Sequence, residues 1–468
     1  MTKTRREFLS DTFSTAGTFG VAAALAALNR RVATGEESQR TSHLRAVNDT
    51  TTGLPLLRLP EGFTYQSFGW TGEPMADGLN TPHAHDGMGV VRSDGGILKL
   101  VRNHEVSADS PAWKSKRAGV FDSRAGGGCV TLEFDPERGE FLDSYASVSG
   151  TSRNCAGGIT PWGTWLTCEE TVLGADSIDR YKDDVKRNFE KEHGWIFEID
   201  ADGTAKPTPI KGMGRFVHEA VAVDRETGIV YETEDRGTSA FYRFVPLEPG
   251  NLGAGGTLQV AEVVGQSDLR GGVTAGEEFS VRWHDIPDPE QANTPGLDEP
   301  DELGVYTQAK SLGASTFARL EGCWAGNGLI YFDATSGGEA KAGQIFQYNP
   351  KTEKLSLLFE SPAKPVLNMP DNLCVSPAGG ILLCEDNDYG ANEFPQRMFA
   401  LSQEGKLALF AENNVQLPNK VRGFQGDFRT KEWAGACFSP DGKWLFVNIQ
   451  TPGMTFAITG PWQDTLLG

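Results

Sequence analysis

One pattern recurs along the sequence: a glycine-containing turn, a short apolar run, and a tip of acidic or amide side chains. The clearest copy is TPWGTWLTCEE, which ends at Glu169 and Glu170. Five further segments have the same pattern: GGILKLVRNHE, TGIVYETEDRG, GNGLIYFDATSGG, GGILLCEDNDYG and DGKWLFVNIQTPG. Successive copies lie about 50 to 100 residues apart, against roughly 40 to 50 in regular propeller repeats. The pattern therefore indicates repeated β units that carry insertions.

The rest of the chain agrees with an all-β fold. It contains 56 glycines among 468 residues, and turn sequences such as SPDG, DADG and DPERGE separate short β-branched and aromatic runs. Radial repetition of such units suits this length and protects the sheet edges. We therefore expect a six-bladed β-propeller with insertions between its strands.

The paired carboxylates at the strand tips need an explanation. Adjacent residues on a strand point to opposite faces, so Glu169 and Glu170 diverge unless the chain bends. Two carboxylates about 4 Å apart repel each other by roughly 4 kcal/mol at an effective dielectric near 20. The tips are either solvated strand ends or parts of one cation site. In a propeller the inner strand ends meet at the channel mouth, which favours a shared cation site.

The formal net charge of −20 argues against nucleic acid as a partner, and no basic stripe follows the N-terminal segment. The charge alone is also compatible with a purely solubilising surface. An acidic channel would repel an anionic substrate unless bound cations reversed the local field.

The N-terminus predicts export. Arg5 and Arg6 lie in TRREFL and precede the apolar segment AGTFGVAAALAAL, which is too short for a membrane span. Paired arginines in this position are typical of a twin-arginine signal. We expect residues 1–33 to be this signal peptide, 34–53 a polar linker and 54–468 a single catalytic propeller domain. The twin-arginine machinery would deliver the mature protein, expected to be a monomer, to the periplasm or the exterior.

The chain has seven cysteines and no CxxC or zinc-type spacing. In an oxidising compartment an odd number leaves at least one unpaired. Cys168, Cys374 and Cys384 lie in apolar runs, where a free cysteine behaves as a small hydrophobe. Cys155 lies instead in the polar, glycine-rich segment SRNCAGGITPWG. It is a candidate metal ligand or nucleophile, or simply a half-buried loop thiol.

Three further motifs carry candidate site residues. GRFVHEAVAVD places Glu219 after a histidine at a strand start, and NMPDNLCVSP contributes Asp371 and Asn372. In FARLEGCWAGNGLIYFD, Arg319 and Glu321 are two residues apart and face the same side of a strand. Such a pair is either an ion pair or a metal ligand beside a phosphate clamp, because a guanidinium matches phosphate geometry.

These motifs together resemble the PhoX-type alkaline phosphatases. The resemblance rests on the twin-arginine leader and, in this order along the chain, on NHE, NCAGGITPWGTWLTCEE, GRFVHEAVAVDRETGIVYETED and PDNL. It implies a six-bladed propeller that hydrolyses phosphomonoesters with a pair of oxo-bridged ferric ions, Fe(3+), and with calcium ions, Ca(2+), at the channel mouth. A small-molecule phosphate ester is then the expected substrate.

The resemblance also implies residue roles. Cys155, Glu219 and Glu321 take the places of the iron ligands, and Arg319 that of the phosphate-binding arginine. The implied calcium ligands lie among the acidic and amide tips: Glu169, Glu170, Glu234, Asp235, Asp371, Asn372, Glu385 and Asp386. Thiolate and carboxylates suit iron, whereas all-oxygen groups suit calcium.

The chain departs from the family at one place. Better-known members carry Arg-Pro-Glu-Trp, whereas this chain has RLEGCW from Arg319 to Trp324. The change affects the loop that orients both ligands, so it puts substrate preference and efficiency in question.

Two other functions are open on sequence alone: a calcium-dependent lactonase or esterase of the propeller type, and a non-catalytic propeller stabilised by calcium. The lactonase has no use for Cys155, and neither alternative has a use for a phosphate clamp at Arg319.

Overall fold

A computed structural model describes residues 44–106, 111–179, 185–297, 299–387 and 395–468. The predicted signal peptide, residues 1–33, lies outside these ranges, as does the first half of the predicted linker, residues 34–43. Within them no helix combines the length and apolar character that crossing a membrane requires.

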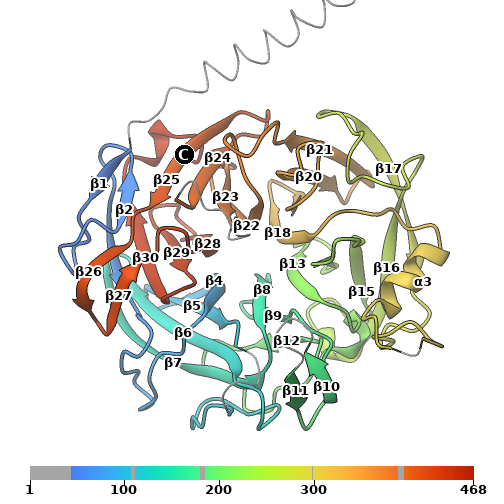
Figure 1. The fold of residues 1–468 in the computed structure, drawn as a ribbon, viewed down its shortest axis with the longest axis horizontal. Coiled ribbons are helices and arrows are strands. Elements are labelled where there is room, and N and C mark those ends of the chain that lie inside the picture. The colour runs from blue at the N-terminus through green and yellow to red at the C-terminus, as the bar shows by residue number, and fades with distance from the viewer. Residues whose placement is uncertain (1–43, 107–110, 180–184, 298, 388–394) are drawn as a thin grey trace, which may run out of the picture.

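The described residues form an all-β propeller around a central channel (Figure 1). Six inner strands contact one another in a closed ring, which is the arrangement that the repeated sequence pattern predicts. In chain order they are β4 (His85–Asp94), β8 (Asn154–Ile159), β13 (His218–Val223), β18 (Leu320–Gly326), β22 (Pro370–Val375) and β28 (Trp433–Phe438).

Each inner strand pairs with an antiparallel second strand, and the six sequence copies form these second strands. Because the pairing is antiparallel, each second strand ends where its inner strand begins, so both contribute to the same channel mouth. The second strands are β5 (Ile97–His104), β9 (Trp165–Glu169), β14 (Val230–Glu234), β19 (Leu329–Ala334), β23 (Ile381–Glu385) and β29 (Leu445–Ile449).

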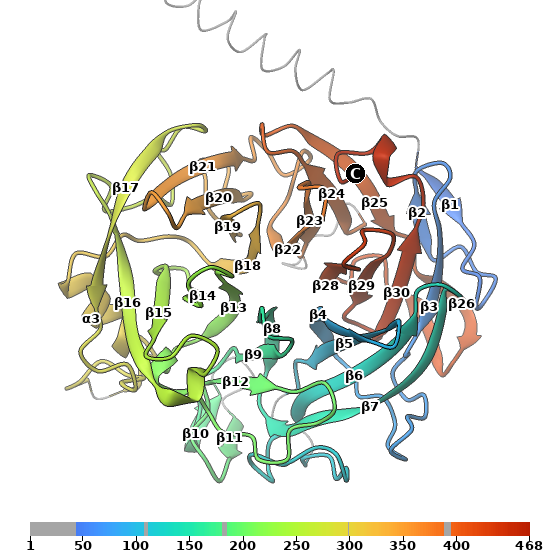
Figure 2. The ribbon, with the colours of Figure 1, turned by 180° about the vertical axis from the view of Figure 1, so that it is seen from behind.

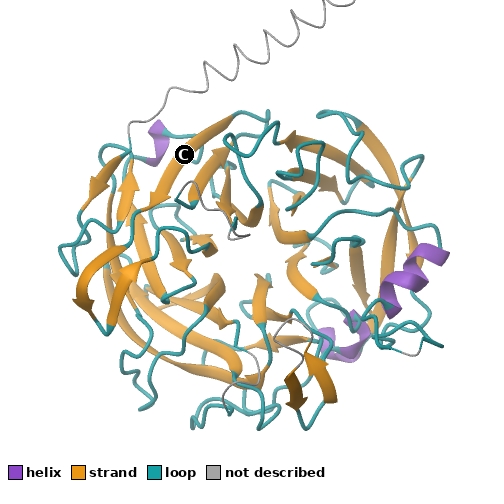
Figure 3. Ribbon diagram, viewed as in Figure 1, coloured by secondary structure: helices purple, strands orange, loops and turns teal. Residues whose placement is uncertain are grey.

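Outer strands complete the sheets (Figure 3). β6 (Gly127–Asp135) and β7 (Glu140–Thr151) extend the β4–β5 pair, and β12 (Ile196–Ile199) extends β8–β9. The remaining outer strands are β15 (Tyr242–Pro246), β16 (Gly256–Val263), β17 (Glu278–Asp285), β20 (Gln344–Asn349), β21 (Lys354–Glu360), β24 (Arg397–Leu401) and β25 (Leu407–Asn413). Two hairpins and a helix are insertions: β10 (Ala175–Asp179) with β11 (Val185–Asn188), β26 (Gln416–Val421) with β27 (Phe424–Asp427), and α3 (Gly304–Ser311).

The expectation of six separate blades is not met by the hydrogen bonding. Among the described residues four sheets have four or more strands, with nine, six, four and four strands. The long strand β17 pairs with both β16 and β21 and so joins two blades into the nine-stranded sheet. The sheet of β8, β9 and β12 has only three strands. Insertions have therefore altered the outer edges while the inner ring is retained.

Segments from both ends of the described chain share one sheet (Figure 2). β3 (Thr64–Phe68) pairs with β30 (Met454–Thr459), which belongs to the sheet of β28 and β29. β1 (Arg45–Val47), inside the predicted linker, pairs with β2 (Leu57–Leu59), and β2 pairs with β25. The ring is thus closed by hydrogen bonds between an early and a late strand.

The core consists of apolar side chains between neighbouring sheets. β9, β14, β23 and β29 are buried at every position, which explains their short continuous apolar runs. Cys168, Cys374 and Cys384 lie in this core with no exposed surface, and all seven cysteines are free thiols. The mouth is therefore built on rigid, fully buried strands.

A candidate metal centre at the channel mouth

Every inner strand has an irregular start. In β13, His218 pairs with Glu234 and the next paired residue is Val221, so Glu219 and Ala220 lie in a bulge. The register shifts near the start of the other five inner strands as well. A β-bulge re-aims a side chain that regular pairing would hold in the sheet. Five of the bulges contain a thiol or carboxyl residue: Asp86, Cys155, Glu219, Glu321 and Asp371.

The turns that lead into four of these strands are strained. The residue directly before the strand has a positive φ at Ala84 (53°), Arg153 (49°), Arg319 (51°) and Met369 (54°). A non-glycine residue in this region costs of order 1–3 kcal/mol, and such residues cluster at functional sites. The strain supports a built site at the mouth, because the same costly turn recurs in four units.

The bulged side chains converge. Cys155 Sγ donates a hydrogen bond to Glu219 Oε1 at 3.0 Å. One ligand atom each from Cys155, Glu170 and Glu219 lies within 4.8 Å of the others, and the same holds for Glu219, Glu321 and Asp371. Oxygens on opposite sides of a calcium ion are about 4.6–5.2 Å apart. Each group thus has the dimensions of a cation site, and Glu219 is common to both.

Burial makes the charged forms of the thiol and carboxyl groups in this cluster unfavourable. It raises the pKa of the Cys155 thiol and of the Glu219, Glu321 and Asp371 carboxyls well above their usual ranges, and nearby carboxylates raise them further. Glu219 Oε2 is buried without a hydrogen-bond partner. A buried carboxylate without a partner is costly, and a bound cation would supply the missing contact.

Arg319 lies beside the cluster. Its Nε donates to Asp235 Oδ1 at 2.8 Å, its Nη2 donates to Asp235 Oδ2 at 3.2 Å, and Nη2 also forms an ion pair with Glu321. About 20% of its side chain remains exposed. The structure therefore brings Arg319, Asp235 and Glu321 together, with the guanidinium reachable from the mouth.

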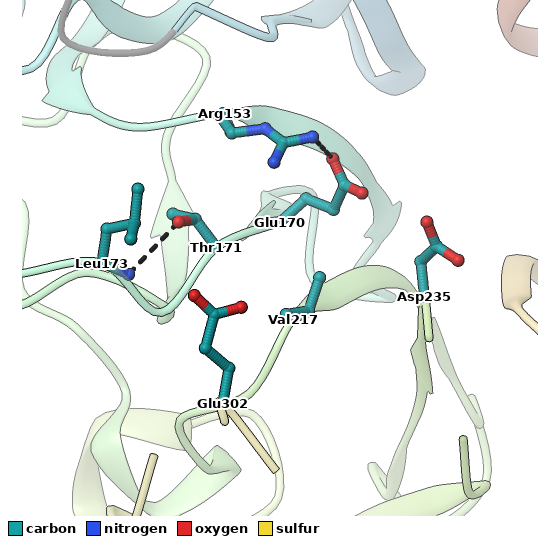
Figure 4. A pocket seen from close by; sticks show the side chains of 7 residues that line it. All are labelled: Arg153, Glu170, Thr171, Leu173, Val217, Asp235 and Glu302. Atoms are coloured by element: carbon teal, nitrogen blue, oxygen red, sulfur yellow. Dashed lines mark hydrogen bonds and ion pairs between the residues drawn. The ribbon is translucent and has the colours of Figure 1, made fainter. Parts of the chain in front are cut away.

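Arg153 occupies the equivalent position in the neighbouring unit. Its Nε donates to Glu105 Oε1 at 3.2 Å. Its Nη2 donates to Glu170 Oε2 at 2.6 Å, the contact drawn in Figure 4. Burial and the neighbouring Glu105 and Asp235 raise the pKa of Glu170 to about 8, although Arg153 opposes the shift. Two arginines thus flank the acidic cluster.

The sequence interpretation missed several mouth residues. Besides Arg153, they are Asp86 and Glu432. Glu105 ends the predicted tip GGILKLVRNHE but was not named as a ligand, and Gln450 links it to Asp86 through hydrogen bonds of 2.9 and 3.2 Å. The charges of Asp86, Glu105 and Asp386 are among the causes that raise the pKa of Glu432, after burial. Asp86 could have been found, since it is the second residue of its inner strand, as are Cys155, Glu219, Glu321 and Asp371.

Some predicted ligands point away from the mouth. Glu169 is fully buried and accepts hydrogen bonds from His193 Nδ1 at 2.7 Å and from the backbone N–H groups of Ser152, Gly194 and Trp195. The pKa of His193 is raised to about 9, mainly by Glu169 and Asp122, against the effect of burial. Glu169 therefore has a complete set of protein partners.

Glu385, Asn372 and one oxygen of Glu234 also have protein partners, whereas Glu234 Oε1 is buried without a hydrogen-bond partner. Glu234 accepts from the Tyr242 hydroxyl at 3.1 Å and from the Ala240 N–H at 3.3 Å. Glu385 binds the Arg397 guanidinium through both oxygens, at 2.9 and 2.6 Å. Asn372 Oδ1 accepts from the Ala436 N–H at 3.0 Å. The second residue of the tip, by contrast, belongs to the mouth at Glu170, Asp235 and Asp386.

The sequence as a whole matches the profile of the family described as alkaline phosphatase PhoX, over residues 43–145 and 138–453. The chain belongs to the PhoX family. It is therefore an enzyme that hydrolyses phosphate monoesters, in a metal-dependent family, and the acidic groups at the mouth are candidates for its metal sites. This favours the phosphatase over the lactonase and the binding propeller that the sequence left open.

Structural comparison agrees on the fold. The structure is similar to PhoX of Pseudomonas fluorescens in complex with vanadate, a transition state analogue, with a TM-score of 0.63 and 18% identity, covering 90% of this chain and 97% of that one. A gluconolactonase from Xanthomonas campestris, XC5397, gives a TM-score of 0.42 at 11% identity, covering 86% and 89%, which is too distant to compare sites. No curated protein matches in a sequence search.

Proposed function

We propose that this PhoX phosphatase hydrolyses its ester at the mouth cluster, with ferric and calcium ions held by the bulged residues and by carboxylates at the neighbouring strand tips. The observation that carries the proposal is that Cys155, Glu170, Glu321 and Asp371 all approach Glu219, so that one carboxylate is common to two ligand groups. In their sites these ions would offset the charge of the phosphoryl group and supply an activated oxygen nucleophile.

The donor types divide the proposed ligands. A thiolate with carboxylates suits iron, so Cys155, Glu219 and Glu321 are the proposed iron ligands. All-oxygen groups suit calcium, which is proposed to bind among the mouth carboxylates: Asp86, Glu170, Asp235, Asp371 and Asp386. Glu169, Glu385 and Asn372 are left out of the revised set, because protein partners already engage their oxygens. Glu234 stays a proposed calcium ligand, because its Oε1 is buried without a hydrogen-bond partner.

Arg319 is proposed to hold the phosphoryl group. A guanidinium presents a planar fork of donors that matches two phosphate oxygens. Asp235 fixes its position through two hydrogen bonds, and the exposed part of the side chain is available to the substrate. The contact would strengthen as charge develops on those oxygens, which is how such a residue accelerates the reaction.

We also propose that the propeller has six blades and that the protein is exported as a monomer. The closed ring of six inner strands supports six radial units, two of which share the nine-stranded sheet. Arg5 and Arg6 support export of a monomer by the twin-arginine pathway to the periplasm or the exterior.

The test compares phosphate binding and turnover in Arg319 variants of the metal-loaded enzyme. Arg319→Lys keeps the charge but loses the fork, and Arg319→Ala loses both, so kcat/KM on a phosphomonoester should fall in that order, by about 100-fold or more for alanine. The inhibition constant of inorganic phosphate should rise in parallel.

Arg243→Ala is the matched control, because Arg243 is similarly half-buried but pairs with Gln259 and Glu353 on an outer strand. Equal inhibition by phosphate in folded wild type and Arg319→Ala would refute the clamp.

A further inference from the structure

A pocket opens directly off the metal centre (Figure 4). Glu170 and Asp235 form one side of it, and both belong to the mouth cluster. A phosphoryl group held by Arg319 would therefore lie next to this space. The pocket is the natural place for whatever is attached to the phosphoryl group.

The lining combines two kinds of side chain. Leu173 and Val217 are its apolar part, and Val217 packs on Val172 and Ala292. Thr171, Arg153 and Glu302 belong to its polar part. Inorganic phosphate alone has no use for an apolar lining, whereas an alcohol with a carbon chain and hydroxyl groups fits both parts.

The backbone of Glu302 is strained, and neighbouring residues hold it in this conformation. It has a positive φ of 58°. Its N–H donates to Asn293 Oδ1 at 2.9 Å, and its carboxylate forms an ion pair with Arg236. Asp301 stiffens the same loop by accepting from the N–H groups of Thr294 and Leu303, at 2.9 and 3.1 Å. Figure 4 shows the Glu302 carboxylate pointing into the space beside Thr171 and Val217. A strained, braced residue facing a pocket indicates a selected function.

Glu302 also comes from a different part of the chain than the other lining residues. It lies in the long connection between β17 and β18, directly before α3, whereas the others follow or precede β8, β9, β13 and β14. An insertion thus supplies one wall of a pocket whose other walls are part of the ring. Binding specificity is commonly set by such loops on a rigid scaffold.

We propose that this pocket receives the alcohol part of the ester. We further propose that Glu302 selects esters of small hydroxylated alcohols, such as glycerol phosphate or sugar phosphates. The inference rests on the proposed phosphatase function of the neighbouring cluster. The ion pair with Arg236 engages the carboxylate from one side, and the remaining acceptor capacity faces the pocket, where it takes hydrogen bonds from substrate hydroxyls. An alkyl phosphate of the same size cannot make these bonds and leaves polar groups unsatisfied.

The test uses glycerol 3-phosphate and propyl phosphate, which differ only in hydroxyl groups. In the purified, metal-loaded wild type, kcat/KM should favour glycerol 3-phosphate by about tenfold or more, as expected for a hydrogen bond to a charged acceptor. Glu302→Leu removes the acceptor at similar size and should abolish most of this preference. Glu302→Gln keeps one acceptor without the charge and should abolish part of it.

Glu353→Gln is the control, because Glu353 forms a comparable ion pair with Arg243 away from the pocket. It should keep the wild-type ratio. Equal kcat/KM for the two esters in wild type, or an unchanged ratio in both Glu302 variants, would refute the inference while leaving the phosphatase intact. Hydrolysis of neither ester would instead refute the proposed function itself. Should the leucine variant fail to fold, the glutamine variant still decides.

Discussion

Glu169 and Glu170 are adjacent in the sequence, yet their surroundings could hardly differ more. The Glu169 carboxylate accepts four hydrogen bonds from His193 and the backbone of two loops. Glu170 shares its space with Glu105 and Asp235, and Arg153 balances only part of their charge. The carboxylate is thus fixed by protein partners at one position, and at the next it belongs to the acidic cluster at the mouth.

The same alternation recurs around the ring. Glu234 and Glu385 have protein partners, whereas their successors Asp235 and Asp386 belong to the mouth. The alternating faces of a strand account for the difference, because the first residue still lies in the sheet and the second projects beyond it. Composition at a strand tip therefore does not tell which carboxylate faces the mouth, whereas position within the tip does.

The largest expected effect comes from mutating the two neighbours separately. Glu170→Gln removes a proposed metal ligand and should lower kcat by more than about 100-fold. Even mutation of a residue that only hydrogen-bonds to a metal ligand lowers metal affinity or activity by about 10- to 100-fold. Glu169→Gln breaks a buried ion pair and should instead lower the free energy of unfolding by about 3–5 kcal/mol. Activity assays, metal analysis and denaturant unfolding on both variants measure the contrast.

In the metal-free protein, Glu170→Gln should also melt at or above the wild-type temperature, since it relieves repulsion. Loss of stability without loss of bound metal in Glu170→Gln would reverse the assigned roles.

A smaller effect should follow from removing the metals. Cations that bind only the folded state stabilise it, by about 2.7 kcal/mol at a concentration 100 times the dissociation constant. Exhaustive chelation should therefore lower both the activity and the melting temperature of the wild type. Calorimetry with and without chelator, after metal removal has been verified, is the measurement.

On chelation the melting temperature of Glu169→Gln should fall by about as much as that of the wild type, because the ion pair that this variant breaks is separate from the acidic cluster. An unchanged melting temperature in chelated wild type would mean that the mouth carboxylates are simply solvated.

The smallest effect is on the pH dependence of stability in the metal-free protein, where Glu170 and the Glu169–His193 pair should act over different pH ranges. Burial raises the pKa of Glu170 from its ordinary value near 4.5 to about 8, so the folded state binds the extra proton and stability falls as pH rises between these values. The raised pKa of His193, about 9, gives stability that is complete below pH 6.5 and is lost as pH rises toward 9.

Unfolding free energies from pH 4.5 to 9 should therefore decline throughout this range. Glu170→Gln should flatten mainly the acidic part, from about pH 4.5 to 6.5, and Glu169→Gln mainly the alkaline part. If both variants kept the wild-type slope over the whole range, neither carboxyl would have the environment described.

The sequence predicted the all-β propeller and the phosphatase family correctly, because strand patterns and contiguous motifs are local signals. The six-bladed expectation is met only in part. The hydrogen-bonded sheets do not divide into six blades, since β17 pairs with a strand more than 70 positions away, and no local pattern specifies that. Site residues within motifs, such as Cys155 and Glu219, do lie together. Asp86 and Arg153 were missed because their role depends on bulges and turns, which arise from packing around the ring.

The pairing of β3 with β30 has a consequence for how the enzyme acquires its activity. The mouth needs β28 beside β4, and these strands become neighbours only when an early and a late part of the chain meet. Joining segments so distant in sequence is slow, because a very long loop must close before the contacts compensate for its entropy. The ligand sites are thus finished late in folding. Removal of either terminal strand would leave an open arc of sheets whose acidic tips no longer face one another.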